Sequence, residues 1–318
     1  MYHAFIYVFV FLTLLVSETL AADLGIIQSG ASIGDKAVVS GRGSVSYSFV
    51  RVDSLGARAK TEDDAFKTGL SENESGVIQN IVDIDYTFAF DGIKMACHEQ
   101  SKVLSPSGKW YNRDWHWAYD GEKMELYRLD PIGENGLLIP LGSIRTENKM
   151  QRHINDPRYD SMMIHGTNVS DFLNGEMDKH SVESIQTGVT EVIDNMVCDV
   201  ITGRDQINNN TITIWMASEV MFRPLRIEIS SPNERMIIRN TFRDYGNGIW
   251  FPQETLRELY YQEENSDQEQ LYARETITIH KDFEVNVAIP SDTFELEFPV
   301  GMTVYDFRSG EFYDIVEE

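Results

Sequence analysis

The stretch VDIDYTFAFDGIKMACHE, residues 82–99, decides the fold class of this chain. Apolar or aromatic side chains at every second position from 82 to 90 alternate with Asp, Thr and Ala, which is the period of a strand with one buried face. The pair Asp91-Gly92 then separates this run from a second one. Because both positions of an Asp-Gly pair tolerate a positive φ, the pair predicts a tight turn, and we expect a β-hairpin here.

The same pattern extends outward on both sides of this hairpin. Upstream, Val45, Tyr47 and Phe49 alternate with serines, and downstream Asp120-Gly121 lies between strand-like residues 115–119 and 123–129. Further strand patterns cover 192–202, 211–217, 225–230, 235–244, 249–256, 273–280 and 283–289. Short turns join many of them. We therefore expect a mainly β protein, an antiparallel curved sheet or half-barrel with a few short helices as a lid.

Turn-forming residues divide the rest of the chain. Residues 52–79 are polar and predict a loop, and Pro and Gly interrupt residues 130–180, where only short helices such as 169–173 are expected. A second short helix is expected at about residues 34–39. The predicted organisation is a signal peptide at 1–22, a half-barrel domain at 23–290 with an irregular helical insertion at about 130–180, and a C-terminal extension at 291–318.

The N-terminal residues predict export. An apolar run, AFIYVFVFLTLLV at residues 4–16, precedes Thr19 and Ala21, which are small residues spaced as a signal peptidase requires. The run is shorter than the roughly 20 residues that span a bilayer, and no later segment approaches that length. We expect a periplasmic or secreted protein without an integral membrane span after removal of the signal.

Charge and cysteine content limit the partners and the disulfide bonds that the protein can have. With 51 Asp+Glu against 27 Lys+Arg, the net charge is −24, which disfavours nucleic acid as a partner because no basic patch offsets it. The two cysteines, Cys97 and Cys198, permit either one disulfide or two buried thiols, and neither belongs to a CxxC motif.

Sequence motifs for catalysis and cofactor binding are absent. The chain has no Walker A motif, dinucleotide-binding glycine motif, HExxH motif or GxSxG elbow. Its seven histidines show no spacing that would place two imidazoles on one metal ion, although a site assembled from distant residues stays open. We therefore predict a non-enzymatic protein without a catalytic residue, metal or cofactor.

Three segments in order resemble the LolA/LolB-like superfamily of exported proteins that sort outer-membrane lipoproteins. They are the hairpin 86–94, the strand 211–216 followed by Pro224-Leu225-Arg226-Ile227-Glu228, and 242–245 followed by 248–252. Together they span about residues 80–260. The resemblance implies a half-barrel fold, an exported protein, and a lipid or lipoprotein acyl chain as ligand.

Two functional hypotheses follow. In the first, an apolar face of the half-barrel binds a lipid or an acylated ligand. The side chains predicted to line it are Tyr86, Phe88, Phe90, Ile212, Ile214, Met216, Leu225 and Ile227. In the second, the aromatic cluster Trp110–Tyr119 stacks on the sugar rings of a polysaccharide, although the alternation of Trp115, Trp117 and Tyr119 is also typical of a strand face packed on a core.

Overall fold

The computed structural model describes residues 22–53, 70–72, 78–104, 110–129, 141–146, 156–160, 163–164, 167–177, 180–205, 209–262 and 269–317. Strands dominate these residues. They are β1 (Ser40–Asp53), β2 (Leu70–Glu72), β3 (Ile78–Asp91), β4 (Lys94–Leu104), β5 (Trp110–Tyr119), β6 (Met124–Arg128), β7 (Leu141–Arg145), β8 (Met163–Ile164), β9 (Thr167–Asn168), β10 (Glu176–Met177), β11 (His180–Ile193), β12 (Met196–Asp205), β13 (Asn210–Ala217), β14 (Arg223–Ser230), β15 (Glu234–Asp244), β16 (Trp250–Gln262), β17 (Glu269–Ile279), β18 (Glu284–Val285), β19 (Thr303–Asp306) and β20 (Glu311–Asp314).

The helices of the described residues are few and short. They are α2 (Leu24–Ala37), α4 (Pro157–Asp160), α5 (Val169–Leu173) and the 3₁₀ turns η2 (Ser218–Val220) and η3 (Ser291–Phe294). In the described part of the chain, no helix has the length and apolar character needed to cross a membrane.

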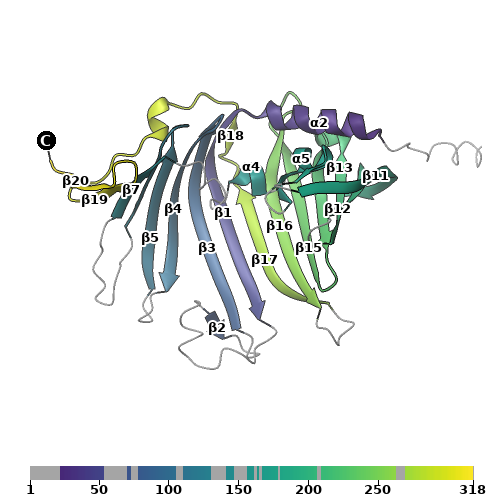
Figure 1. Ribbon diagram of the computed structural model, residues 1–318, viewed down its shortest axis with the longest axis horizontal. Coiled ribbons are helices and arrows are strands. Elements are labelled where there is room, and N and C mark those ends of the chain that lie inside the picture. The colour runs from purple at the N-terminus through teal and green to yellow at the C-terminus, as the bar shows by residue number, and fades with distance from the viewer. Residues whose placement is uncertain are drawn as a thin grey trace, which may run out of the picture.

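One curved, largely antiparallel sheet organises the molecule, and in Figure 1 it runs from β20, β19 and β7 on one side to β12 and β11 on the other. Its strands follow the order β7–β6–β5–β4–β3–β1–β17–β16–β15–β14–β13–β12–β11. Strand β1 joins the two halves, because it pairs with β3 on one side and with β17 on the other. The predicted fold class, a mainly β curved sheet with few helices, is confirmed.

The two Asp-Gly turns are confirmed as well. Strands β3 and β4 pair up to Asp91↔Lys94, and β5 and β6 pair up to Tyr119↔Met124. Gly92 and Gly121 have positive φ values of 58° and 104°, which is the backbone conformation for which glycine is favoured in a tight turn. The short helix predicted at 169–173 is α5, and the Asn168 side chain caps it by accepting from the Ser170 amide.

The N-terminal helix was predicted too short. Instead of residues 34–39, helix α2 covers Leu24–Ala37 and begins after Asp23, whose side chain accepts a hydrogen bond from the Gly25 amide at 2.8 Å. Its glycines lower the intrinsic helix propensity, which is why the pattern indicated so little helix. Burial of Ile27, Ala31 and Gly34 along one side of α2 supplies the stabilisation that propensity lacks.

Two other strand predictions were wrong in their bounds. The segment 192–202 is not one strand. It contains the last two residues of β11, a turn at Asp194 and Asn195, which both have positive φ (50° and 65°), and then residues 196–202 of β12. Asp and Asn tolerate this conformation, so a two-residue hairpin forms without glycine. Of the segment 283–289, only Glu284–Val285 is a strand.

The C-terminal residues continue the sheet at its β7 end. Strand β19 pairs with β7 in parallel and with β20 antiparallel. A small core joins Met302 and Val304 to Ile144. The predicted signal peptide falls almost entirely outside the described residues, as does much of the insertion at 130–180, and the three domain boundaries stay predictions.

Candidate functional site

One face of the sheet carries the main apolar core, and we call it the covered face. Directly opposite residues on neighbouring strands point to the same face, so register links Tyr86 through Val45 to Ile279, and Ile238 through Ile227 to Ile214. A third row connects these two rows of residues. Ile277, two residues from Ile279, lies opposite Thr255, which lies opposite Asn240, two residues from Ile238. The covered face is therefore continuous across both halves of the sheet.

All eight predicted ligand-binding residues are buried, at 5% exposure or less. Tyr86, Phe88 and Phe90 pack in one cluster with Trp117, Phe251 and Phe283. Ile212, Ile214, Met216 and Ile227 pack in a second cluster, against Ile27 and Ala31 of α2 and Phe172 of α5. Ile164 of the small β8–β9 sheet also packs in the second cluster, so helices α2 and α5 and this small sheet cover that part of the face.

Leu225 does not share a cluster with the other seven. It packs with Trp215, Ala217 and Cys198 in a third cluster. The register of β13 and β14 shifts between Trp215 and Met216, and such an irregularity changes which side chains point to a given face. Simple alternation along β14 could not anticipate this shift.

A cavity of about 340 Å³ lies at the C-terminal end of α2. This volume is within the range of small-molecule sites. Its lining combines apolar and charged side chains from α2, the β3–β4 turn, α4 and β16, and includes Asp35, Lys36, Val38, Val39, Gly92, Arg158, Asn168, Arg223, Phe251 and Pro252. Phe251 stacks on Phe90 and on Phe283, with ring centroids 6.2 and 5.4 Å apart, so the cavity borders the aromatic cluster of the covered face.

Two arginines of this lining are held in fixed positions. The Arg158 guanidinium lies 4.5 Å from the Phe90 ring centroid, donates to the Gly92 carbonyl at 2.9 Å and pairs with Asp156 at 2.7 Å. Arg223 is buried and donates to Asp35 at 2.5 Å and to the Gly34 carbonyl at 2.6 Å. Burial lowers the pKa of Arg223, and Asp35 opposes this shift. Neither arginine was a predicted site residue, because the charge pattern carries no information on their partners.

Two of the aromatic side chains proposed for sugar stacking are part of the core. Trp117 and Tyr119 are 4% and 9% exposed and pack in the aromatic cluster. Trp115 is half-buried, with the Arg113 guanidinium 4.4 Å from its ring centroid. The side chains of Trp110 and Tyr111 lie outside the described residues. Burial of Trp117 and Tyr119 disfavours a stacking platform, because their ring faces already contact protein.

The two cysteines are free, buried thiols in separate clusters. Cys97 lies on β4 and Cys198 on β12, and seven strands separate them in the sheet order. A disulfide requires Cα atoms within about 7 Å, so of the two interpretations the structure has the buried thiols. Burial raises the pKa of Cys198 to about 11, and that of Cys97 is raised further by burial and by Glu99.

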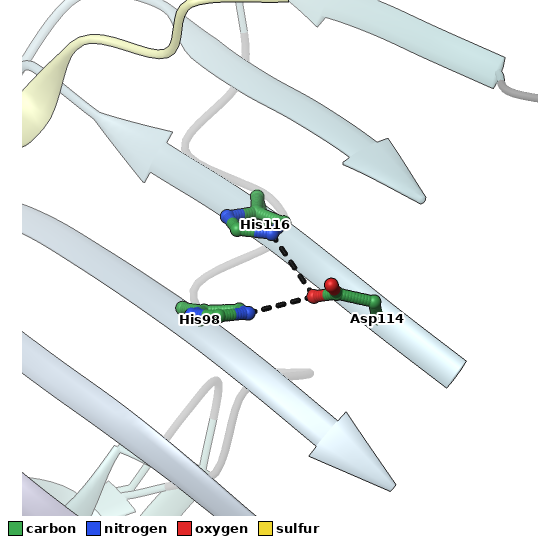
Figure 2. A group of neighbouring side chains, drawn as sticks. All are labelled: His98, Asp114 and His116. Carbon is green, nitrogen blue, oxygen red and sulfur yellow. Dashed lines mark hydrogen bonds and ion pairs between the residues drawn. The ribbon is translucent and has the colours of Figure 1, made fainter. Parts of the chain in front are cut away.

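A polar cluster occupies the opposite face of the β4–β5 hairpin (Figure 2). His98 and His116 each direct Nε2 at Oδ1 of Asp114, at 2.6 and 2.9 Å. The two imidazole rings stack with centroids 3.9 Å apart. Burial and His98 lower the pKa of His116, while Asp114 opposes this shift. The three residues form a group whose ligand atoms lie within 4.8 Å of one another, which sequence spacing did not reveal.

The comparisons find structural similarity but no match in sequence. No family model matches the chain, and no curated protein matches it. A solved structure described as an outer membrane lipoprotein-sorting protein domain from Vibrio parahaemolyticus is 7% identical, with a TM-score of 0.40 over 86% of this chain and 97% of that one. A LolA superfamily protein from Nitrosomonas europaea is 12% identical, with a TM-score of 0.36 over 85% and 97%. At TM-scores below 0.5 and identities of 7% and 12%, neither structure supports an argument on function.

Proposed function

We propose that the protein is an exported, non-enzymatic carrier that binds a lipid or an acylated ligand between α2 and the covered face. The observation that supports this most directly is the cavity at the end of α2, which combines an apolar wall with fixed cations. Val38, Val39, Phe251 and Pro252 suit a hydrocarbon chain. Lys36 suits an anionic head group, and Arg158 and Arg223 add positive charge that Asp156 and Asp35 partly neutralise. Export is supported by the apolar run at residues 4–16.

Helix α2 is suited to act as a lid over the apolar side chains. Its underside contributes Ile27 and Ala31 to the cluster that contains Ile212, Ile214 and Met216. Displacing α2 would open this cluster to a hydrocarbon chain, which would gain about 25 cal/mol per Å² of apolar surface removed from water. In the closed protein, α2 therefore covers the apolar surface that a ligand would contact.

Side chains from other elements bond to α2 at several described positions. Arg223 pairs with Asp35 and donates to the Gly34 carbonyl, Asn286 donates to the Ala37 carbonyl at 2.8 Å, and the Gln28 side chain donates to the Leu173 carbonyl at 2.7 Å. At two positions α2 approaches the chain closely enough to require glycine. A Cβ at Gly30 would lie 2.1 Å from the Phe222 ring, and one at Gly34 would lie 2.9 Å from the Met221 carbonyl oxygen.

The first experiment is native mass spectrometry of protein purified without detergent, followed by solvent extraction and lipid analysis. We expect a stoichiometric lipid or acyl species, or stoichiometric uptake of a fluorescent fatty-acyl probe that unlabelled fatty acid displaces. A ligand-free mass together with no uptake of the probe would contradict the proposal.

A variant of the lid tests where the ligand binds. In Gly30→Val, the new side chain collides with Phe222, so either Phe222 must turn away or α2 must lift. We expect faster probe uptake and a lower Tm. Ser29→Val is the matched control, because Ser29 is exposed on the same helix. Adding Phe222→Ala to Gly30→Val removes the collision and should restore uptake kinetics towards the parent. If uptake is the same in all three variants, the ligand does not enter beneath α2.

A further inference from the structure

The pairing of β4 with β5 brings two histidines and an aspartate together. His98 lies directly opposite His116, and Asp114 lies two residues before His116 on the same strand. Residues directly opposite each other, and residues two apart on one strand, point to the same face of a sheet. The three side chains therefore share one face of the sheet, opposite the face of Cys97 and Trp117, and Figure 2 shows them pointing toward one another.

The side chains converge on one point. Both Nε2 atoms lie within hydrogen-bonding distance of a single carboxylate oxygen, at 2.6 and 2.9 Å, and all three ligand atoms lie within 4.8 Å of one another. Both imidazole rings can reach this oxygen because the strand register holds them side by side. Here the rings stack at 3.9 Å with an angle of 17° between their planes.

Neighbouring aromatic residues fix this arrangement. Tyr127 of β6 stacks on the far side of His116, with ring centroids 4.4 Å apart, and Phe298 packs against Tyr127 at 6.0 Å. The imidazole of His116 is thus held between two rings. Support of this kind around ligating side chains is what fixes their orientation in protein metal sites.

We infer that His98, Asp114 and His116 form a binding site for a divalent transition-metal ion of the Zn²⁺ type. Two imidazole nitrogens and one carboxylate oxygen are a ligand set that zinc accepts, with remaining positions left to water or an external ligand. Nothing in the carrier function proposed above requires this ion, so the two proposals stand independently.

The surroundings of the cluster favour a cation. Side-chain exposures of 36%, 31% and 22% for His98, Asp114 and His116 leave a path for an ion from solvent. His98 also borders a cavity of about 530 Å³ on the same side of the sheet, whose lining includes Asp85 and Asp282. These carboxylates and the net charge of −24 raise the local concentration of cations. Open space beside His98 provides room for the ligands that protein does not supply.

The test is equilibrium dialysis of the purified protein against Zn²⁺ after treatment with a chelator, with metal quantified by elemental analysis. We expect one Zn²⁺ per chain. His98→Gln, His116→Gln and Asp114→Asn replace each ligand with an uncharged amide of comparable shape, and each should weaken Zn²⁺ binding by at least about tenfold. His280→Gln is the matched control, because His280 is exposed on the same side and bonds to Ser46 instead of to the cluster.

A second readout covers variants that fold poorly. Co²⁺ replaces Zn²⁺ in such sites and has a visible spectrum that depends on its ligands. The parent and His280→Gln should show a Co²⁺ spectrum that Zn²⁺ abolishes, and the three ligand variants should not. Circular dichroism checks that each variant retains the β-sheet spectrum of the parent. The inference is overturned if the parent binds no stoichiometric Zn²⁺, or if the three ligand variants bind it as tightly as His280→Gln does.

Discussion

Asn240 shows how a single buried side chain completes the sheet where the backbone does not. Pro224 lies near the start of β14, before the regular pairing of β14 with β15, which begins at Arg226↔Arg239. The Asn240 side chain donates to the Pro224 carbonyl at 2.8 Å and accepts from the Thr255 hydroxyl at 2.9 Å. It therefore bridges β14 and β16 from β15, at 2% exposure.

Replacing Asn240 with Leu should therefore destabilise the protein despite the apolar surroundings. The Pro224 carbonyl and the Thr255 hydroxyl would both lose a partner, which costs about 1–3 kcal/mol for each buried polar group. Urea unfolding measures the free energy of unfolding. Thr241→Val is the control, because Thr241 is the next residue on β15 and is exposed. Equal stabilities of the two variants would mean that water reaches the site and replaces the amide.

The residue scale is also where sequence reasoning was least complete. The turn at Asp91-Gly92 and the alternation of Tyr86, Phe88 and Phe90 are local signals, and burial of all three aromatic rings follows from them. The pairing of His98 with His116 depends on the register of β4 and β5. The residues between these strands, SPSGK at 105–109, predict a turn but do not fix the register as a two-residue Asp-Gly turn does. Alternation along single strands was enough to predict which side chains form the core. Prediction of the cluster of His98, Asp114 and His116 would have required the register between β4 and β5.

At the scale of elements, the ion pair that joins α2 to β14 has one buried partner and one partly exposed partner. Arg223 is 5% exposed, while Asp35 at the end of α2 is 24% exposed. Removal of Asp35 takes the carboxylate from a buried cation, whereas removal of Arg223 leaves a carboxylate that water can reach. The two single substitutions should therefore differ in cost.

We expect Asp35→Ala to lower the free energy of unfolding by about 3–5 kcal/mol, as for other buried pairs that lose one ion. Arg223→Met keeps the aliphatic packing and should cost about 1–3 kcal/mol, largely the loss of its hydrogen bonds. Glu284→Ala is the control, because its ion pair with Arg42 is about half exposed on both sides and contributes at most about 1 kcal/mol. A larger loss for Arg223→Met than for Asp35→Ala would show that the hydrogen bond from Arg223 to the Gly34 carbonyl, and not the pair with Asp35, contributes most to holding α2 on β14.

The elements that sequence patterning missed have a common physical cause. Helix α2 contains three glycines and β11 is mostly polar, so neither shows the propensity or the apolar period that identifies an isolated element. Each is stabilised by partners distant in the chain. Ile27 of α2 packs on β13 side chains, and β11 pairs with β12 after the Asp194-Asn195 turn. Elements with strong local signals, such as β3 and α5, were predicted with nearly correct bounds.

At the scale of the whole molecule, an open sheet must protect its end strands. An uncovered end strand presents unpaired backbone groups that another chain can pair with. At the β7 end, the C-terminal residues provide this protection, because β19 pairs with β7 and Met302 and Val304 pack against Ile144. The Leu296 amide also donates to the buried Glu125 carboxylate at 2.9 Å. The C-terminal residues therefore complete the sheet at this end.

Deleting residues 291–318 should consequently produce self-association rather than a smaller, equally soluble protein. The deletion exposes the backbone of β7 and the side chains of Ile144 and Tyr127, so we expect a lower Tm and a larger species than the full chain at equal concentration in analytical ultracentrifugation. Deleting only 316–318 is the control, since Val316 is 73% exposed and Ile315 keeps its bond to the Met302 carbonyl. A shortened chain that matches the full chain in mass distribution and Tm would mean that β7 is protected by other residues, and β19 would then be a surface attachment rather than the end of the sheet.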